Sequence, residues 1–268
     1  MATFVMFRLY APLGAFGDVA VGERRGGFDR PARSAIFGLI AAALGVDRND
    51  DRSHAALDQN YALALRIDTP GVPIQDYHTV QAPPARTGKA RGTTWPTRRA
   101  ALSDERNLET LLSLRDYRAD PLSTVVLVAR NGAPDVFSPE DIAEALRKPR
   151  YTLYLGRKAC PLGLPPRGTV VAADGLAEAL DNYDRDATTP EQALSRDLRI
   201  LPAAACYYAD ADLAAPDGDI LRPAFKLIGV ERRRDLATSR RRWQFDLRDE
   251  LVLHRMTMSK TADARGNI

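Results

Sequence analysis

The chain has 268 residues, of which 45% are hydrophobic and 27% charged, and its 38 basic and 35 acidic residues give a net charge of only +3. This composition is typical of a folded globular protein and excludes intrinsic disorder, collagen-like structure and coiled coil. The longest apolar run, residues 34–46, is too short to span a bilayer, and the first residues lack the features of a signal peptide. We therefore expect no membrane contact and a cytoplasmic location.

The first part of the chain predicts a strand, a helix and a second strand. Residues 3–9 form an apolar run that favours a strand, and a loop rich in glycine and arginine follows at residues 22–31. A helix is expected from an N-cap at Ser34 to a stop at Gly45. Residues 61–67 are the second predicted strand.

A broken stretch separates this strand from the next. Residues from about 72 to 100 contain four prolines and two glycines, which makes them too irregular for a core element and too long for an ordinary connection. Residues 122–129 then predict a β-branched strand, and Ser138 begins a helix that ends before Pro149. A further strand is expected near residues 169–172.

This order of elements fits an α+β sheet of the ferredoxin-like or RNA-recognition-motif (RRM) type, although other open α+β sheets share the same pattern. Beyond about residue 184 the pattern is harder to interpret. A basic cluster at residues 232–242 precedes Trp243 there, and no repeats are present. We expect a domain at residues 1–185 and an extension of uncertain structure at residues 186–268.

The basic residues are unevenly distributed. Residues 77–103 and 145–173 contain no Asp or Glu, so nothing in these windows neutralises their cations. Aromatic or imidazole side chains lie among those cations at Tyr77, His78, Trp95, Tyr151 and Tyr154. Cations interleaved with stacking groups are typical of single-stranded RNA recognition. A solvated surface is the alternative interpretation of each window.

Most enzyme classes find no support in the motifs. No segment has the spacing of a phosphate-binding P-loop or of a serine nucleophile elbow. The three histidines lie far apart, and Cys160 and Cys206 are too scattered for a zinc site or a disulfide framework, so we expect no metal and no cofactor. Metal-free RNA cleavage needs only a general acid or base and nearby cations. His78 is the candidate for that role, with RNA contact or a structural hydrogen bond as its alternatives.

Three segments carry a resemblance to a known family: residues 76–81 (DYHTVQ), residues 30–39 (RPARSAIFGL) and, most specifically, residues 148–162 (KPRYTLYLGRKACPL). In order and spacing they resemble the CasD subunits of type I-E CRISPR Cascade complexes, over roughly residues 3–185. The resemblance implies an RRM-like fold of the repeat-associated RAMP superfamily. It also implies a projecting β-hairpin "thumb" at about residues 72–100 and a glycine-containing loop at about residues 150–162.

The resemblance implies a non-catalytic subunit for antiviral defence. Such a subunit caps and holds the 5′ handle of CRISPR RNA (crRNA), contacts the backbone and large subunits, and meets target DNA through the assembled ribonucleoprotein, whose guide pairing reads sequence. The alternative is a metal-independent endoribonuclease that processes CRISPR repeat RNA, with His78 in the catalytic role. A DNA-facing structural module is a third interpretation that nothing in the sequence favours.

The resemblance and the two windows together give an expected RNA-binding set. We expect the first group near the handle and the third group along the glycine-containing loop. In the second group, the Arg and Lys residues are expected across the junction between handle and guide, and Tyr77, His78 and Trp95 are the stacking or imidazole groups of the same window. The members are Arg24, Arg25, Arg30 and Arg33; Tyr77, His78, Arg86, Lys89, Arg91, Trp95, Arg98 and Arg99; and Arg150, Tyr151, Tyr154, Gly156, Arg157 and Lys158.

Overall fold

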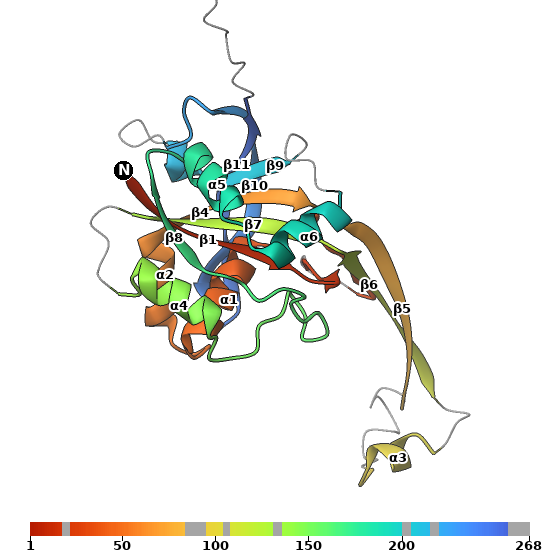
Figure 1. The fold of residues 1–268 in the computed structure, drawn as a ribbon. Coiled ribbons are helices and arrows are strands. Elements are labelled where there is room, and N and C mark those ends of the chain that lie inside the picture. The colour runs from red at the N-terminus through yellow and green to blue at the C-terminus, as the bar shows by residue number, and fades with distance from the viewer. Residues whose placement is uncertain are drawn as a thin grey trace, which may run out of the picture.

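The computed structural model describes residues 1–17, 22–83, 95–103, 108–130, 136–199, 205–214 and 220–256. It is a mixed α/β structure with two sheets (Figure 1). In these ranges no helix combines the length and the apolar composition that crossing a bilayer requires.

Within the described ranges the main sheet has seven strands in the order β10-β11-β9-β4-β7-β1-β8, and each neighbouring pair is antiparallel. The four strands predicted from the sequence are all present in it. The members are β1 (Ala2–Tyr10), β4 (Tyr61–Thr69), β7 (Leu122–Ala129), β8 (Thr169–Ala173), β9 (Cys206–Asp210), β10 (Phe225–Ser239) and β11 (Gln244–Arg255).

Helices cover both faces of this sheet. Side chains alternate along β1, so that Val5 and Phe7 face one core while Phe4 and Met6 face the other. Figure 1 shows α1, α2 and α4 on one side and α5 on the other. The helices are α1 (Arg33–Leu44), α2 (Asp51–Asn60), α4 (Pro139–Arg147), α5 (Leu176–Arg185) and α6 (Thr189–Asp197), with a 3-10 turn η4 (Ala211–Ala214).

The two predicted helix starts have different outcomes. Ser138 caps α4 as expected: its hydroxyl accepts from Asp141 N, and the Asp141 carboxylate accepts from Ser138 N. The expected cap at Ser34 is wrong, because Ala32 is the N-cap and makes no side-chain bond. Asp235 of β10 instead accepts the N–H of Arg33 at 2.8 Å. Asp235, which lies 202 positions away in the sequence, therefore satisfies a backbone N–H at the start of this helix. No local sequence pattern could reveal this partner.

A second sheet is built on a long two-stranded ribbon. β5 (Val72–Ala82) pairs with β6 (Glu109–Ala119) along its whole length, and β2 (Leu13–Gly14) and β3 (Arg24–Arg25) join β6 at the ribbon's base. Figure 1 shows the ribbon projecting away from the main sheet, with α3 (Arg98–Ala101) at its far end. The stretch expected to be irregular thus lies outside the core, yet its first part is a regular strand.

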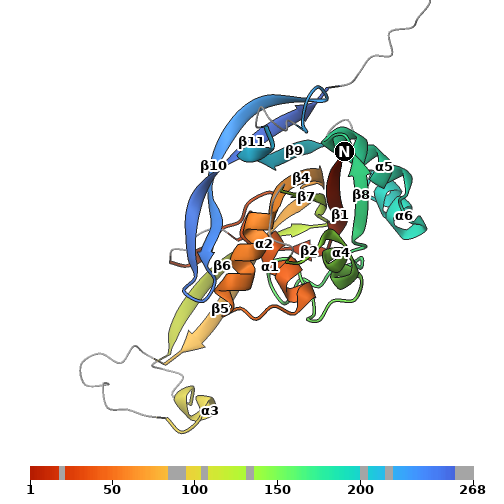
Figure 2. The same ribbon diagram turned by 90° about the vertical axis from the view of Figure 1, so that its left-hand side faces the viewer.

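Residues after 186 contribute three strands to the main sheet. β9 pairs with β4 and β11, and β11 pairs with β10, so strands from both sides of residue 185 share one sheet. Figure 2 shows the β10–β11 hairpin curving along one side of the molecule to end beside α1 and α2. Asp51 of α2 holds this end by accepting from Ser239 Oγ at 2.9 Å and from Arg240 N at 3.1 Å.

His54 of α2 is expected to make stability depend on pH. Burial and then the nearby Arg240 lower its pKa below the ordinary value of about 6.5. The unfolded chain therefore takes up a proton more readily, and stability declines as pH falls through about 6.5. Between about pH 7.5 and 5.5 we expect the Tm of the unchanged protein to fall more than that of His54→Gln. Scanning fluorimetry at several pH values measures the Tm, with exposed His254→Gln as the matched control. An equal change of Tm with pH in the unchanged protein and in His54→Gln would contradict this prediction.

Candidate nucleic-acid interface

Three segments that lie far apart in the sequence meet at the base of the ribbon. Leu114 N of β6 donates to Glu23 O at 2.9 Å, and Phe28 N donates to Phe16 O at 2.7 Å. On the other side, Ala15 N donates to Leu155 O at 3.0 Å. The arginine-rich loop at residues 22–31, the ribbon and the glycine-containing loop are therefore fixed to one another by backbone hydrogen bonds.

A pocket of about 290 Å³ opens at this junction. Aromatic rings and two arginines surround it, a combination suited to an unstacked base and its phosphate. Arg24 is exposed, and its Nη2 lies 3.8 Å from Asp116 Oδ2, a long distance for an ion pair. This exposed pair is weak, so the Arg24 guanidinium remains available to a ligand. The lining residues are Phe16, Arg24, Gly27, Phe28, Pro73, Ile74, Gln75, Asp116, Tyr117 and Arg118.

Arg157 connects the glycine-containing loop to the ribbon. Its guanidinium carbon lies 4.7 Å from the centre of the Tyr117 ring, a cation–π distance. Its Nη1 is buried without a hydrogen-bond partner among the residues that the structure describes. Lys158 beside it is exposed. The loop thus places a half-buried guanidinium against the Tyr117 wall of the pocket, with an exposed ammonium next to it in the sequence. Two such cations suit a phosphate ligand.

Gly156 is required by the backbone of this loop. Its φ is +90°, and a Cβ added there would lie 1.7 Å from Ala15 O. Gly156→Ala is therefore expected to lower the free energy of unfolding by at least about 2 kcal/mol, because the strained φ and the backbone clash must both be relieved. Urea unfolding followed by circular dichroism measures this. Gly229→Ala is the matched control, since an added Cβ meets nothing within 4 Å there, and an equal cost in both variants would refute the assignment.

The first part of the glycine-containing loop is bonded to the C-terminal end of α1, away from the pocket. Arg150 N donates to Ala43 O at 2.9 Å and Tyr151 N to Ala42 O at 3.2 Å. The side chains of Arg150, Tyr151 and Tyr154 are all exposed, with Tyr151 50% and Tyr154 37% accessible. Neither tyrosine lies within a strand or in the core, so packing against a strand does not account for either ring.

The ribbon carries the candidates from the first acid-free window. Tyr77 is 60% exposed on β5, and the Nδ1 atom of exposed His78 lies 2.8 Å from the Asp76 carboxylate oxygen Oδ2. Trp95 is half-buried, whereas Arg98 and Arg99 are exposed in α3. Arg86, Lys89 and Arg91 lie outside the described residues.

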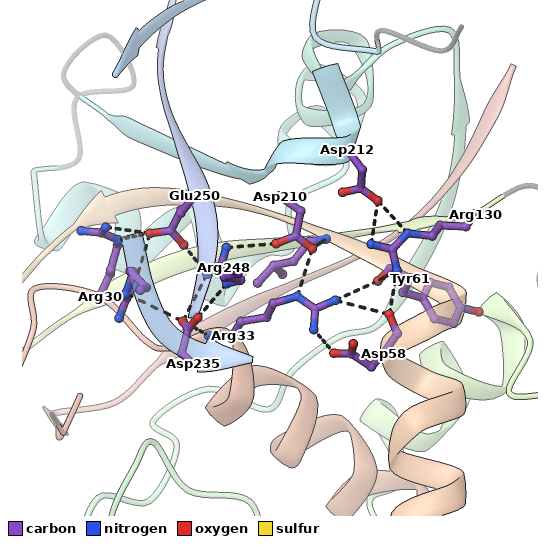
Figure 3. Close-up of polar contacts among 12 residues, drawn as sticks. Arg30, Arg33, Asp58, Tyr61, Arg130, Asp210, Asp212, Asp235, Arg248 and Glu250 are labelled. Carbon is purple, nitrogen blue, oxygen red and sulfur yellow. Dashed lines mark hydrogen bonds and ion pairs between the residues drawn. The ribbon is translucent and has the colours of Figure 1, made fainter. Parts of the chain in front are cut away.

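Arg30 and Arg33 are placed differently from expectation. Both are buried, and their guanidinium groups enter a network of carboxylates (Figure 3). Arg30 Nη2 contacts Glu250 Oε2 at 2.7 Å, and Arg33 Nε contacts Asp210 Oδ2 at 3.0 Å. Side chains that are enclosed and already neutralised are poor phosphate ligands. We therefore leave both arginines out of the RNA-binding set.

The same network joins the carboxy-terminal hairpin to the amino-terminal helices. Arg248 of β11 contacts Asp235 Oδ1 at 2.7 Å, Asp210 Oδ1 at 3.0 Å and Glu250 Oε1 at 2.5 Å. Burial opposes ionisation of Asp235, but the hydrogen bond from Arg248 outweighs it and lowers the pKa of this carboxyl. Arg233, a member of the basic cluster, is buried and stacks on Phe28 at 4.5 Å, so β10 also supports the pocket wall.

Sequence reasoning missed the aromatic and basic residues of β6. Tyr117 and Arg118 line the pocket, yet no strand was predicted at residues 109–119. A search for windows free of acids passes over this segment because Asp116 lies within it. The informative signal is the tyrosine between two basic residues, Arg115 and Arg118, close to the next strand.

Comparisons with known proteins agree with this architecture. A model of the family described as CRISPR-associated protein (Cas_Cas5) matches residues 4–249. The CRISPR system Cascade subunit CasD of Escherichia coli (strain K12) is 33% identical over 196 residues, which cover 69% of this chain and 78% of that protein.

Solved structures show the same fold. A chain of a "CRISPR RNA-guided surveillance complex" has a TM-score of 0.53 at 22% identity and covers 94% of this chain and 91% of its own. A "Crystal structure of Cas protein" has a TM-score of 0.55 at 22% identity, with coverage of 94% and 95%. The family model spans most of this chain and extends past residue 185. The resemblance seen in the sequence is thereby confirmed: this chain belongs to the CRISPR-associated Cas5 protein family, with type I-E Cascade CasD as a relative.

Proposed function

We propose that this protein is a non-catalytic, RNA-binding subunit of a Cascade complex that caps and holds the 5′ handle of crRNA. The observation that carries the proposal is the junction at the ribbon base, where an accessible arginine loop, an aromatic-lined pocket and the Arg157–Lys158 loop converge. Its relative is named as a Cascade subunit, and a protein of the same fold comes from an RNA-guided complex. In this role the chain contacts the backbone and large subunits and meets target DNA through the assembly.

The topology favours the ribbon base over the sheet face as the proposed site for RNA. With α2 and the β5–β6 ribbon set aside as insertions, the elements β1, α1, β4, β7, α4 and β8 follow one another in the chain. Their strands have the spatial order β4-β7-β1-β8, which we interpret as the ferredoxin-like arrangement of an RRM-like domain. An RRM stacks bases on its open sheet face. Here that face is covered by α5, since Phe4 and Met6 pack with Leu180. Loops and strand ends are the surfaces left for RNA.

The proposed contacts follow from accessibility. We assign the β5–β6 ribbon as the thumb at the handle-to-guide junction and the loop at residues 150–162 as the holder of the handle. The proposed RNA-binding residues are the accessible or half-buried members of the expected set together with two from β6: Arg24, Arg25, Tyr77, His78, Trp95, Arg98, Arg99, Tyr117, Arg118, Arg150, Tyr151, Tyr154, Gly156, Arg157 and Lys158.

One observation favours endoribonuclease activity as a second candidate. His78 Nδ1 lies 2.8 Å from Asp76 Oδ2, and Arg115 is the cross-strand partner of Asp76. A carboxylate that orients an imidazole beside a cation is the arrangement that metal-free RNA cleavage uses. The three side chains lie on the exposed ribbon and do not line the pocket at its base, so we rank binding first.

Ultraviolet crosslinking separates the two functions. The purified chain is irradiated with end-labelled repeat RNA in the absence of metal, and the products are run on one denaturing gel. Intact, crosslinked RNA that is displaced only by competitors containing the handle supports the binding subunit. A discrete shortened product that disappears with His78→Ala would instead assign the protein to the endoribonucleases.

A further inference from the structure

The tip of the β10–β11 hairpin is a cationic feature that the handle proposal does not use. It rests on α1 and α2 (Figure 2), where Arg240 donates to the Ser34 carbonyl across Gly38. A Cβ at Gly38 would lie 2.7 Å from Arg240 Nη1, so this glycine in the helix leaves room for the guanidinium. Arg48, from the turn before α2, donates from Nε to Arg240 O at 3.4 Å. The turn before α2 and the tip of the hairpin therefore form one surface.

The arginines of this tip lack carboxylate partners within the part of the chain that the structure describes. No carboxylate oxygen there lies within ion-pair distance of the guanidinium groups of Arg48, Arg240, Arg241 and Arg242. The aspartates of the neighbouring turn are used otherwise. Asp47 accepts from Asn49 N, Asp50 caps α2 through Ser53, and Asp51 accepts from Ser239 and the hairpin backbone.

Trp243 completes the tip with an aromatic platform. Its side chain is 61% exposed, which is unusual for an indole and leaves area for a ligand. The Arg48 guanidinium lies 4.6 Å from its ring centre and Phe245 packs edge-on at 5.3 Å, so the ring is held in place. Its φ of +57° is a left-handed conformation that glycine favours and bulky residues avoid. The turn therefore holds a large aromatic where a glycine would fit better.

We propose that this arginine–tryptophan tip, formed by Arg48, Arg240, Arg241, Arg242 and Trp243, is a second binding site for single-stranded nucleic acid. The exposed Arg241 and Arg242 hold phosphates, and one base stacks on the open side of Trp243. An acidic protein segment would need the cations but not a supported, exposed indole, which is why nucleic acid is the better match. The site does not depend on handle binding, because it uses none of the residues at the ribbon base.

Tryptophan fluorescence tests the site directly, because Trp95 and Trp243 are the two tryptophans of the sequence. In a full-length Trp95→Phe background, Trp243 is the sole reporter. Oligomers of uridine and of thymidine, about 20 nucleotides long, are titrated separately to distinguish RNA from DNA. We expect either or both to quench the emission. Arg241→Ala/Arg242→Ala should weaken binding about tenfold and reduce the slope of log K against log salt by about 1.4.

Two variants separate binding from folding. Trp243→Gly suits the left-handed φ, so this variant should fold. Its affinity for the oligomers should fall about tenfold, measured by fluorescence anisotropy in the Arg157→Ala/Lys158→Ala background. Arg232→Ala is the matched control, because this exposed arginine of the same hairpin already pairs with Asp249 at 3.3 Å. Three results would overturn the proposal: the oligomers fail to quench the emission, Arg232→Ala loses as much oligomer affinity as the tip variants, or polyglutamate quenches the emission and the oligomers do not. Quenching that persists in the Arg157→Ala/Lys158→Ala background would show that the tip acts independently of the handle site.

Discussion

Asp210→Ala is expected to lower the free energy of unfolding by about 3–5 kcal/mol, and with it the Tm by about 10 °C. Asp210 is buried, and its carboxylate accepts from Arg33 Nε, from Arg248 Nη1 and from the backbone N–H of Leu63. Removing it leaves two buried guanidinium groups short of a counter-charge, and desolvated charges without partners are costly. Urea unfolding followed by circular dichroism measures the loss.

Asp212→Ala is the matched control for this prediction. Asp212 lies two residues further on and also contacts an arginine, Arg130, at 2.7 Å, but both side chains are substantially exposed. An exposed pair contributes less than about 1 kcal/mol because water solvates both charges when it breaks. Equal losses in the two variants would show that burial of the network does not matter. In that case the carboxy-terminal hairpin would be held mainly by its strand pairing.

The largest expected effect on function belongs to the glycine-containing loop. Arg157→Ala/Lys158→Ala should weaken binding of handle RNA by about 10- to 100-fold at moderate salt and reduce the salt slope by about 1.4. Arg157 is held against the Tyr117 ring, so its guanidinium is oriented before RNA arrives. Little additional ordering is then needed on binding, which raises its contribution. Fluorescence anisotropy with labelled handle RNA measures the affinity.

Arg147→Ala/Lys148→Ala removes the same two charges nearby. Both of these side chains already lie beside Glu144, with contacts of 3.9 Å and 3.1 Å, so they have a partner before RNA arrives. We expect this control to keep its handle affinity within about twofold. Unchanged affinity in Arg157→Ala/Lys158→Ala, or an equal loss in the control, would count against a specific site at the loop and favour general attraction by positive charge.

Residue type alone could not separate binding arginines from structural ones. Arg24 and Arg33 both lie in arginine-rich segments near the amino terminus, yet one is exposed and the other is enclosed by carboxylates from β9 and the α2 end. One of the two carboxylates that enclose Arg33, that of Asp210, lies 177 positions away in the sequence. The basic cluster divides in the same way, since Arg233 is buried under Phe28 whereas Arg241 is exposed.

Local sequence patterns were enough to predict four strands of the main sheet, the helix capped by Ser138 and the family. The strands at residues 122–129 and 61–67 and the cap at Ser138 depend on neighbouring residues, whose propensities and side-chain hydrogen bonds act within one turn or one strand. Tertiary structure alone decided the partner of the α1 end, the pairing of β6 and the joining of β9–β11 to the main sheet. These contacts close long loops, so burial and register across the whole fold select them, and no short segment encodes them.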